Sequence, residues 1–354
     1  MPTSGTEGAA DTAARPVVIG IDAGGTRTRA AAAWAADDGG PPLHTGVSGP
    51  GNALSVPIDV LTAHLREAVA AAAPPTLRPH VRAVAAGLAG CSALPGNAGA
   101  AHASAALRTA LADLGIRPDV TAVSSDTEIA LAGAPGTPCD GLVLIAGTGA
   151  VAARLAGGFT VATADGNGWL LGDSGSGFWI GRRAVRSALA ALDGRGRPTL
   201  LTTAVLAHYL GQAATQAPAT PTAAQDVRDR LVQAVHERPV LELALLAPLV
   251  ARAAEDGDRV ARRLLSGAAK RLVKTLDALS PRPEETLVTT GGLLGPGGVL
   301  LGPLKCRLAP RGLQPVPVPD GLAGAVAVAR KALARTGRPG RGSPTLGPSS
   351  NAAS

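Results

Sequence analysis

Residues 17–28 of this 354-residue chain have the sequence VVIGIDAGGTRT. The first five are apolar or glycine, which is typical of a buried β-strand. Two adjacent glycines then permit a tight turn, because glycine has no Cβ to hinder the backbone. Residues 29–34 (RAAAAW) form a second, mostly apolar run. We therefore predict a β-hairpin with the glycines at its turn.

The turn of this hairpin contains groups that suit an anion. Gly24 and Gly25 allow backbone N–H groups to approach a ligand, and Thr26 and Thr28 add hydroxyl donors. Asp22, at the end of the strand, is a candidate to hold Mg²⁺ through one of its waters. The turn is not a Walker A loop, since the sequence contains no G-x-x-x-x-G-K-[ST]. An ordinary hairpin turn is the alternative interpretation of so short a motif.

A second strand–turn–strand pattern lies in the other half of the chain. Residues 142–146 (LVLIA) are apolar, Gly147, Thr148 and Gly149 follow, and residues 151–155 form the return strand. Strand and helix patterns alternate around both hairpins, so we predict an α/β fold with two similar lobes. Two such turns facing each other across a cleft would hold a nucleotide's phosphates from both sides. Phosphoryl transfer depends on this kind of positioning.

Asp126 is the candidate for proton transfer. It follows the predicted strand 120–124 and begins a helix, so its carboxylate could face the cleft and act as a general base. The alternative is a helix N-cap, a position that favours aspartate. Both roles can belong to one residue if the second carboxylate oxygen faces a substrate.

Two further glycine-rich segments could contact a ligand. Residues 165–180 (DGNGWLLGDSGSGFWI) are dense in glycine, and Asp173 could accept hydrogen bonds from sugar hydroxyls. Ser174 or Ser176 could cap the helix that follows. Gly291 and Gly292 follow a predicted strand and would let an adenosine lie against bare backbone. An ordinary loop with a capped helix, and an ordinary glycine turn, are the alternatives.

The composition limits the classes of protein to consider. A length of 354 residues suffices for two domains and a sizeable core. The net charge is +7, but no basic stripe interleaved with aromatic residues indicates a nucleic-acid surface. No apolar run approaches the roughly 20 residues of a membrane span, and the N-terminus has no apolar signal-peptide core. We expect a soluble, cytoplasmic protein without nucleic-acid or membrane partners.

Cys91, Cys139 and Cys306 show neither a disulfide framework nor a C-x-x-C metal spacing. We expect them to be small buried hydrophobic residues in a reducing compartment. The first 15 and last 19 residues, 1–15 and 336–354, are rich in small and polar residues and are expected to be disordered tails.

Four of these segments together resemble the N-acetylglucosamine kinase branch of the BadF/BadG/BcrA/BcrD ATPase family, within the actin/hexokinase/Hsp70 superfamily. DAGGTRT (22–28) resembles the family's first phosphate motif, and IAGTGA (145–150) resembles the second. GWLLGDSGSGFWIG (168–181) is similar to the most specific family signature, and TTGGLL (289–294) to the adenosine motif. The resemblance extends from residue 17 to about 335.

The resemblance implies two ribonuclease H-like (actin-like ATPase) lobes, each a mixed β-sheet with flanking helices, around a central cleft. Residues 16–118 would form the first lobe and 119–335 the second, with the last helix a candidate to return to the first lobe. Carried over by position, the implied roles are a catalytic base (Asp126), sugar contacts (Asn52, Asp126, Gly168, Trp169, Asp173), nucleotide contacts (Gly24, Gly25, Thr26, Thr28, Gly147, Thr148, Gly149, Gly291, Gly292) and a metal contact (Asp22).

Three positions depart from the family pattern. Ala150 replaces the serine that usually ends the second phosphate motif, and Ser174 replaces a glutamate beside the sugar. Ala23 replaces a glycine of the first motif. The first two changes lie on the sugar side, so the identity of the sugar is less determined than the use of ATP.

The resulting hypothesis is an ATP- and Mg²⁺-dependent amino-sugar kinase. It would transfer the γ-phosphoryl group of ATP to a hydroxyl, O6 being expected, of N-acetylglucosamine or glucosamine. A homodimer is expected by resemblance. The alternatives are a non-catalytic sugar and ATP sensor, and an ATP-driven activator of a partner reductase. The activator would need its cysteines to hold an iron–sulfur cluster.

Overall fold

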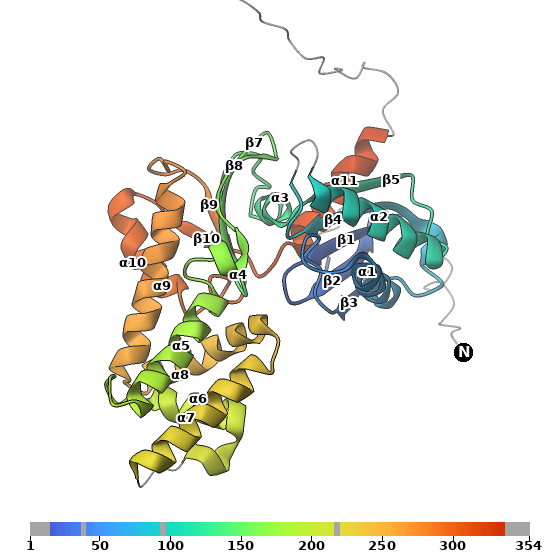
Figure 1. Cartoon of the computed structure of the whole chain (residues 1–354). Coiled ribbons are helices and arrows are strands. Elements are labelled where there is room, and N and C mark those ends of the chain that lie inside the picture. Colours follow the sequence, from blue (N-terminus) through green and yellow to red (C-terminus); the bar gives the residue numbers. More distant parts are fainter. Residues whose placement is uncertain (1–14, 37–39, 93–96, 216–219, 337–354) are drawn as a thin grey trace, which may run out of the picture.

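The computed structural model describes residues 15–36, 40–92, 97–215 and 220–336. Its strands form two five-stranded sheets, one in each of two lobes (Figure 1). The strand orders are β3-β2-β1-β4-β5 and β10-β9-β6-β7-β8. Both sheets are mixed and flanked by helices, which confirms the predicted two-lobed α/β fold. Of the expected tails, residues 1–14 and 337–354 lie outside the described residues.

The first sheet starts as an antiparallel meander and continues in parallel. Its strands are β1 (Val17–Ala23), β2 (Thr28–Trp34), β3 (His44–Ser48), β4 (Val81–Leu88) and β5 (Val120–Ser125). Helices α1 (Ile58–Ala72) and α2 (Ala98–Asp113) pack on one face, and α11 (Leu322–Thr336) on the other. Because both faces are covered, β1 and β2 are apolar almost throughout instead of alternating.

Helix α11 reaches the first sheet although it comes last in the chain. A Cβ built on Gly20 of β1 would lie 2.5 Å from the backbone nitrogen of Val326 in α11. A Cβ on Gly324 of α11 would lie 1.8 Å from the carbonyl oxygen of Ile129. Glycine at both positions therefore allows backbone-to-backbone contact, and α11 joins the first sheet to the helix that contains Ile129.

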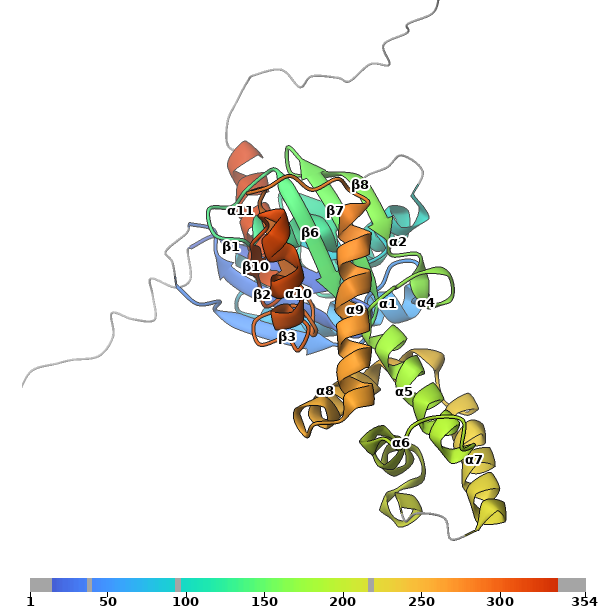
Figure 2. The ribbon, with the colours of Figure 1, turned by 90° about the vertical axis from the view of Figure 1, so that its left-hand side faces the viewer.

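The second sheet repeats the hairpin of the first. Its strands are β6 (Gly141–Ala146), β7 (Ala150–Ala156), β8 (Phe159–Asp165), β9 (Leu287–Thr290) and β10 (Pro315–Pro317). Helix α3 (Asp126–Ala132) packs against one face, while α9 (Arg259–Asp277) and α10 (Leu301–Leu308) lie over the other (Figure 2). The antiparallel pairs β1–β2 and β6–β7 confirm the predicted repeat of strand, turn and strand.

A helical extension projects from the second lobe (Figure 1). It consists of α5 (Gly177–Leu192), α6 (Leu200–Leu210), α7 (Pro221–His236), the 3₁₀ helix η3 (Val240–Leu246) and α8 (Ala247–Glu255). The amphipathic helices α5, α8 and α9 bury their apolar faces in a core shared with the second sheet. Three short 3₁₀ helices, η1 (Arg78–His80), η2 (Gln212–Thr215) and η4 (Ala309–Arg311), lie at connections.

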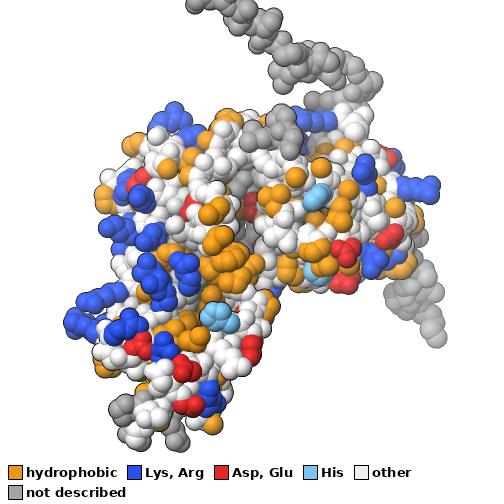
Figure 3. Space-filling model, in the orientation of Figure 1, with side chains coloured by type: hydrophobic (Ala, Val, Ile, Leu, Met, Phe, Trp, Pro, Cys, Tyr) orange, Lys and Arg blue, Asp and Glu red, His pale blue; other side chains and the backbone are white. Residues whose placement is uncertain are grey.

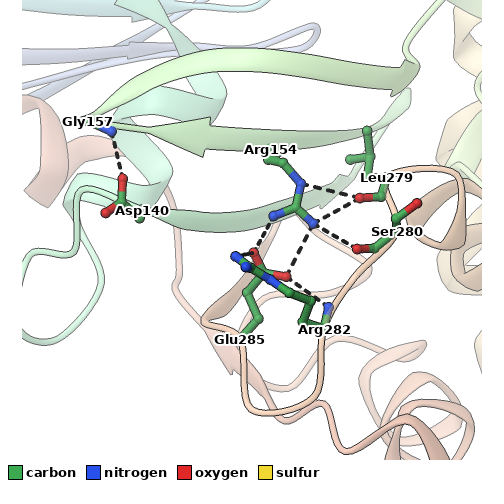
Figure 4. Close-up of polar contacts among 7 residues, drawn as sticks. All are labelled: Asp140, Arg154, Gly157, Leu279, Ser280, Arg282 and Glu285. Atoms are coloured by element: carbon green, nitrogen blue, oxygen red, sulfur yellow. Dashed lines mark hydrogen bonds and ion pairs between the residues drawn. The ribbon is translucent and has the colours of Figure 1, made fainter.

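Arg154 of β7 forms hydrogen bonds with the segment that directly follows α9, and so connects this segment to the second sheet (Figure 4). Its guanidinium donates to the carbonyl oxygens of Leu279 and Ser280, at 2.9 and 3.1 Å from Nη2, and pairs with Glu285. Glu285 also accepts the backbone N–H of Arg282 at 3.0 Å. A cation near the last carbonyls of a helix is favourable. This network holds the loop that leads into β9.

The structure corrects one expectation about the lobes. Strand β5 pairs with β4 in the first sheet, so the boundary expected at residues 118 and 119 would assign this strand to the wrong lobe. Residues 240–255 form η3 and then α8, with Pro248 in the first turn of α8. Proline has no N–H to donate and suits a helix start. Strand β8 was not predicted.

Within the described ranges, none of the helices has both the length and the apolar character needed to span a bilayer.

Candidate active site

The two glycine–threonine turns meet between the lobes. Thr26, after β1, and Thr148, after β6, lie with their hydroxyl oxygens 2.5 Å apart, although they are 122 positions apart in sequence. A backbone hydrogen bond closes each turn. The N–H of Gly24 donates to the carbonyl oxygen of Arg27 in the first turn, and the N–H of Gly147 donates to that of Gly149 in the second, both at 2.9 Å. The molecular surface is hollowed between the lobes (Figure 3). The structure thus brings together two turns contributed by separate sheets.

The second turn is held by two other predicted segments. Its carbonyl oxygens at Gly147 and Thr148 accept the N–H groups of Gly177 and Phe178, at 2.8 and 3.2 Å, where α5 begins. Gly291 has φ +92°, and a Cβ there would lie 2.4 Å from the Ala146 carbonyl oxygen. Gly291 and Gly292 therefore lie beside the second turn, and at Gly291 only glycine permits that approach.

Asp126 is the first residue of α3, not its N-cap. Ser125 caps this helix by accepting the N–H of Glu128, whose side chain bonds back to the N–H of Ser125 at 3.1 Å. This capping box makes the N-cap interpretation of Asp126 wrong and leaves its carboxylate unused by the cap. Burial, and secondarily the negative charge of Asp22, raise the pKa of Asp126 to about 7.

Asp22 lies at the end of β1 with its side chain 13% exposed. It accepts the N–H of Gly321 at 3.1 Å, and Arg29 lies 3.9 Å away. Arg29 also lies 3.8 Å from Asp320. Burial is the main cause that raises the pKa of Asp22, and the charge of Asp320 adds to it. Sequence reasoning missed Asp320 and Gly321, because only the return of α11 brings them to Asp22.

Asp173 supports the second turn. It has φ +55°, is 8% exposed and accepts the N–H of Ala150 at 3.0 Å. Burial raises its pKa. Asp165, another residue that sequence reasoning missed, accepts the N–H groups of Asp173 and Ser174 at 2.7 and 2.9 Å. Ser176 caps α5 by accepting the N–H of Trp179. Of the two predicted caps, Ser174 and Ser176, the structure therefore confirms Ser176.

The residues expected at the sugar differ in what they contact. Asn52 uses its side-chain oxygen to accept the N–H groups of Leu54 and Ser55, at 2.9 and 3.1 Å. This leaves the amide nitrogen as the group available to a ligand. Gly168 begins the short helix α4 (Gly168–Leu171), and Trp169 packs against Phe178 with ring centroids 5.6 Å apart.

Thr28 is fully buried, and its hydroxyl oxygen has no partner among the described residues. Its expected contact with the nucleotide stays a prediction.

One expectation about the cysteines needs correction. Cys139 and Cys306 are exposed and Cys91 is partly buried, so the prediction that all three are buried was wrong. Burial, followed by the charges of Asp126 and Glu128, raises the pKa of the Cys91 thiol to about 12.

The residues near Asp22 fit a magnesium ion. Mg²⁺ uses one or two carboxylates and completes its shell with waters and phosphate oxygens. After burial, the negative charge of Asp320 raises the pKa of Asp22 more than Arg29 lowers it. The charge of Asp22 in turn raises the pKa of Asp126. Nowhere in the described ranges do three or more His, Cys, Asp or Glu side chains gather as a closed metal site.

Comparisons with known proteins identify similar chains. The model of the BadF/BadG/BcrA/BcrD ATPase family matches residues 19–302. An N-acetylmuramic acid/N-acetylglucosamine kinase of Clostridium acetobutylicum is 30% identical over 176 residues, which are 48% of this chain and 53% of that protein. The chain thus matches about half the length of this curated relative.

Two solved structures resemble the whole fold. A candidate N-acetylglucosamine kinase from Chromobacterium violaceum superposes with a TM-score of 0.64 at 26% identity, covering 90% of this chain and 99% of that one. A candidate N-acetylglucosamine kinase from Porphyromonas gingivalis gives a TM-score of 0.63 at 21% identity, covering 89% and 99%.

Proposed function

Because this chain belongs to the BadF/BadG/BcrA/BcrD ATPase family, we propose that it is an ATP-dependent amino-sugar kinase. One observation carries the proposal: turns from two separate sheets meet at Thr26 and Thr148, whose hydroxyl oxygens lie 2.5 Å apart. Asp22, in the strand that leads into the first turn, is close enough to Asp126 for its charge to raise the pKa of Asp126. The curated relative and the similar structures support a sugar as the acceptor.

The nucleotide is proposed to lie across the two turns. Gly24, Gly25 and Thr26 would contact its phosphates from the first lobe, and residues 147–149 from the second. Gly291 and Gly292 would contact the adenosine. Asp22 would hold the Mg²⁺, which neutralises phosphate charge when bound.

The acceptor is proposed to be N-acetylglucosamine or glucosamine. The free amide nitrogen of Asn52, the α4 segment with Gly168 and Trp169, and the carboxylate of Asp173 are its proposed contacts. Asp173 already accepts one backbone N–H, so a sugar hydroxyl would use its remaining acceptor positions. Ala150 and Ser174 make this side of the site less polar than the family pattern.

Asp126 is proposed to act as the base of the transfer. The O6 hydroxyl of the sugar gives its proton to the Asp126 carboxylate as the oxygen forms a bond to the γ-phosphorus. The bond from that phosphorus to the β,γ-bridging oxygen breaks, and ADP leaves. A base whose pKa lies near the working pH suits this role.

An ADP-release assay tests the proposal. ATP and Mg²⁺ are supplied with N-acetylglucosamine, glucosamine, N-acetylmuramic acid, N-acetylmannosamine or glucose in turn. We expect ADP formation stimulated by at least one amino sugar, with the product identified as the 6-phosphate. Sugar binding without turnover by any of the five would contradict the kinase and favour the sensor.

Two expectations accompany the proposal. A homodimer remains a prediction, which sedimentation of the purified protein would check. The cytoplasmic location is likewise a prediction, to be checked by cell fractionation.

A further inference from the structure

Four exposed arginines gather on the second lobe, outside the proposed active site. Arg183 of α5 and Arg271 of α9 both stack on the ring of Trp179, with guanidinium carbons 4.6 and 5.1 Å from its centroid. Arg182 lies 5.7 Å from the Phe178 ring, and Arg186 follows one turn further along α5. Blue side chains cover the crossing of α5 and α9 in Figure 3.

Among the residues that the structure describes, these four arginines have no acidic partner. None of them forms an ion pair or hydrogen bond with any residue in the described ranges, whereas Arg154 has every side of its guanidinium occupied. Burial lowers the pKa of Arg183, and the neighbouring positive charges of Arg271, Arg186 and Arg182 lower it further. The cluster therefore concentrates positive charge that no acidic side chain of the described ranges pairs with.

The cluster borders a small apolar hollow. Arg182 and Arg186 line it together with Val185 and Leu189 of α5, Val232, Val235 and His236 of α7, and Leu243 of η3. Its volume is about 150 Å³. An apolar cavity of roughly this volume holds a benzene-sized molecule. No carboxylate is among the lining residues.

We propose that this hollow binds a small organic anion with an apolar body of about six carbons. The apolar side chains of α5, α7 and η3 would contact the body, and Arg182 and Arg186 would pair with the carboxylate or phosphate head. Arg183 and Arg271 add to the attraction. A purely apolar ligand would leave the positive charge unmatched, and a bare inorganic anion would leave the hollow unfilled.

The site is separate from the proposed phosphoryl transfer. None of its lining residues belongs to the two turns or to the sugar contacts. Helix α5 nevertheless begins at the second turn, through the hydrogen bonds of Gly177 and Phe178. An anion bound here would thus contact the same helix that supports Thr148.

Isothermal titration at constant ionic strength, without ATP or sugar, tests the proposal. The probes are hexanoate and phenyl phosphate, with 1-hexanol as the neutral match of hexanoate. We expect saturable binding of at least one anionic probe, and binding of 1-hexanol weaker than that of hexanoate by about tenfold. The stronger anionic probe identifies the preferred head group. Absence of binding by both anionic probes, or equal binding of hexanoate and hexanol, overturns the proposal.

Matched variants locate the binding. Arg182→Gln/Arg186→Gln should weaken the anionic probe by about tenfold or more, because charged hydrogen bonds are lost. Val235→Phe should block binding by filling the hollow, and Arg252→Gln, an exposed arginine of α8, should change nothing. Unchanged affinity in the double variant places the binding elsewhere and overturns the proposal. ADP release by the double variant should equal that of the wild type, so failure here is distinguishable from failure of the proposed kinase.

Discussion

The hairpins β1–β2 and β6–β7 have the same topology but different chemistry. The first has Asp22 one residue before the end of its leading strand, where the second has Ile145. The carboxylate near the second turn, Asp173, comes from a loop 23 residues beyond Ala150 and accepts that residue's N–H. A repeated scaffold therefore places one carboxylate at the proposed metal side and the other at the proposed sugar side.

The arginines of the two return strands differ in the same way. Arg29 of β2 is 35% exposed and lies 3.8 to 3.9 Å from two carboxylates of the cleft. Arg154 of β7 lies away from the turn and holds the loop before β9 (Figure 4). The first hairpin thus brings its arginine to the proposed metal side of the site, and the second uses its arginine to hold a loop of the lobe. The predictions below test this division.

Replacement of Asp126 should have the largest effect. We expect Asp126→Asn to lower kcat of the amino-sugar kinase by about 10² to 10⁴-fold, the usual contribution of a general base. The measurement is ADP release at saturating ATP and sugar, with Asp59→Asn, an exposed carboxylate at the start of α1, as the control. An Asp126→Asn enzyme within threefold of wild type would exclude this residue as the base.

The raised pKa of Asp126 predicts opposite effects of pH on activity and stability. Activity, as kcat/KM, should rise with pH through about 7, where the carboxyl loses its proton. The folded protein keeps that proton up to about pH 7, whereas the unfolded chain loses it near 3.8. The folded state is therefore destabilised as pH rises from about 4 to 7, and the loss is complete above 7.

Removal of the titrating carboxyl should remove this part of the stability change. Thermal unfolding should give Asp126→Asn a higher Tm than wild type at pH 8 and the same Tm near pH 4. A wild-type advantage at pH 8 would contradict the raised pKa.

The paired threonines test whether both turns contact the nucleotide. Thr26→Val and Thr148→Val should each raise KM for ATP by about tenfold, since each loses one hydrogen bond to a charged oxygen. Thr109→Val, on the exposed side of α2, is the control. An effect confined to Thr148→Val would mean that the second lobe alone binds the phosphates.

Replacing the arginines of the two return strands, Arg29 and Arg154, should have the smallest effects. One substitution should alter mainly catalysis and the other mainly stability. Arg154→Met leaves Glu285, which is 9% exposed, with Arg282 as its remaining cation. The loss of its charged hydrogen bonds should cost about 2 kcal/mol of unfolding free energy, with kcat little changed. Arg29→Met should change kcat/KM while unfolding free energy falls by less than about 1 kcal/mol. Urea unfolding measures the unfolding free energy, and ADP release measures the activity. A stability loss confined to Arg29→Met, with an activity change confined to Arg154→Met, would contradict the division between the two hairpins.

Sequence reasoning predicted the local features of the site well. The two hairpins, the position of Asp126 after a strand, and the capping of α5 by Ser176 all follow from patterns a few residues long. It failed where distant segments decide the outcome. Asp320 and Asp165 have no local motif, and the lobe to which β5 belongs depends on which strand it pairs with. The burial of Thr28 likewise depends on Gly51, which packs against its hydroxyl.

The amino-acid sequence by itself determined the two strand–turn–strand units, because hydrophobic periodicity and glycine act on the backbone locally. Only the tertiary structure decided that Thr26 and Thr148 meet, and that Asp22 and Asp320 crowd one cleft. The tertiary structure also raises the pKa of Asp126 through burial, and it leaves four arginines of α5 and α9 exposed without an acidic partner among the described residues. Charge and burial depend on what distant segments bring to a point in space, and no local pattern encodes that.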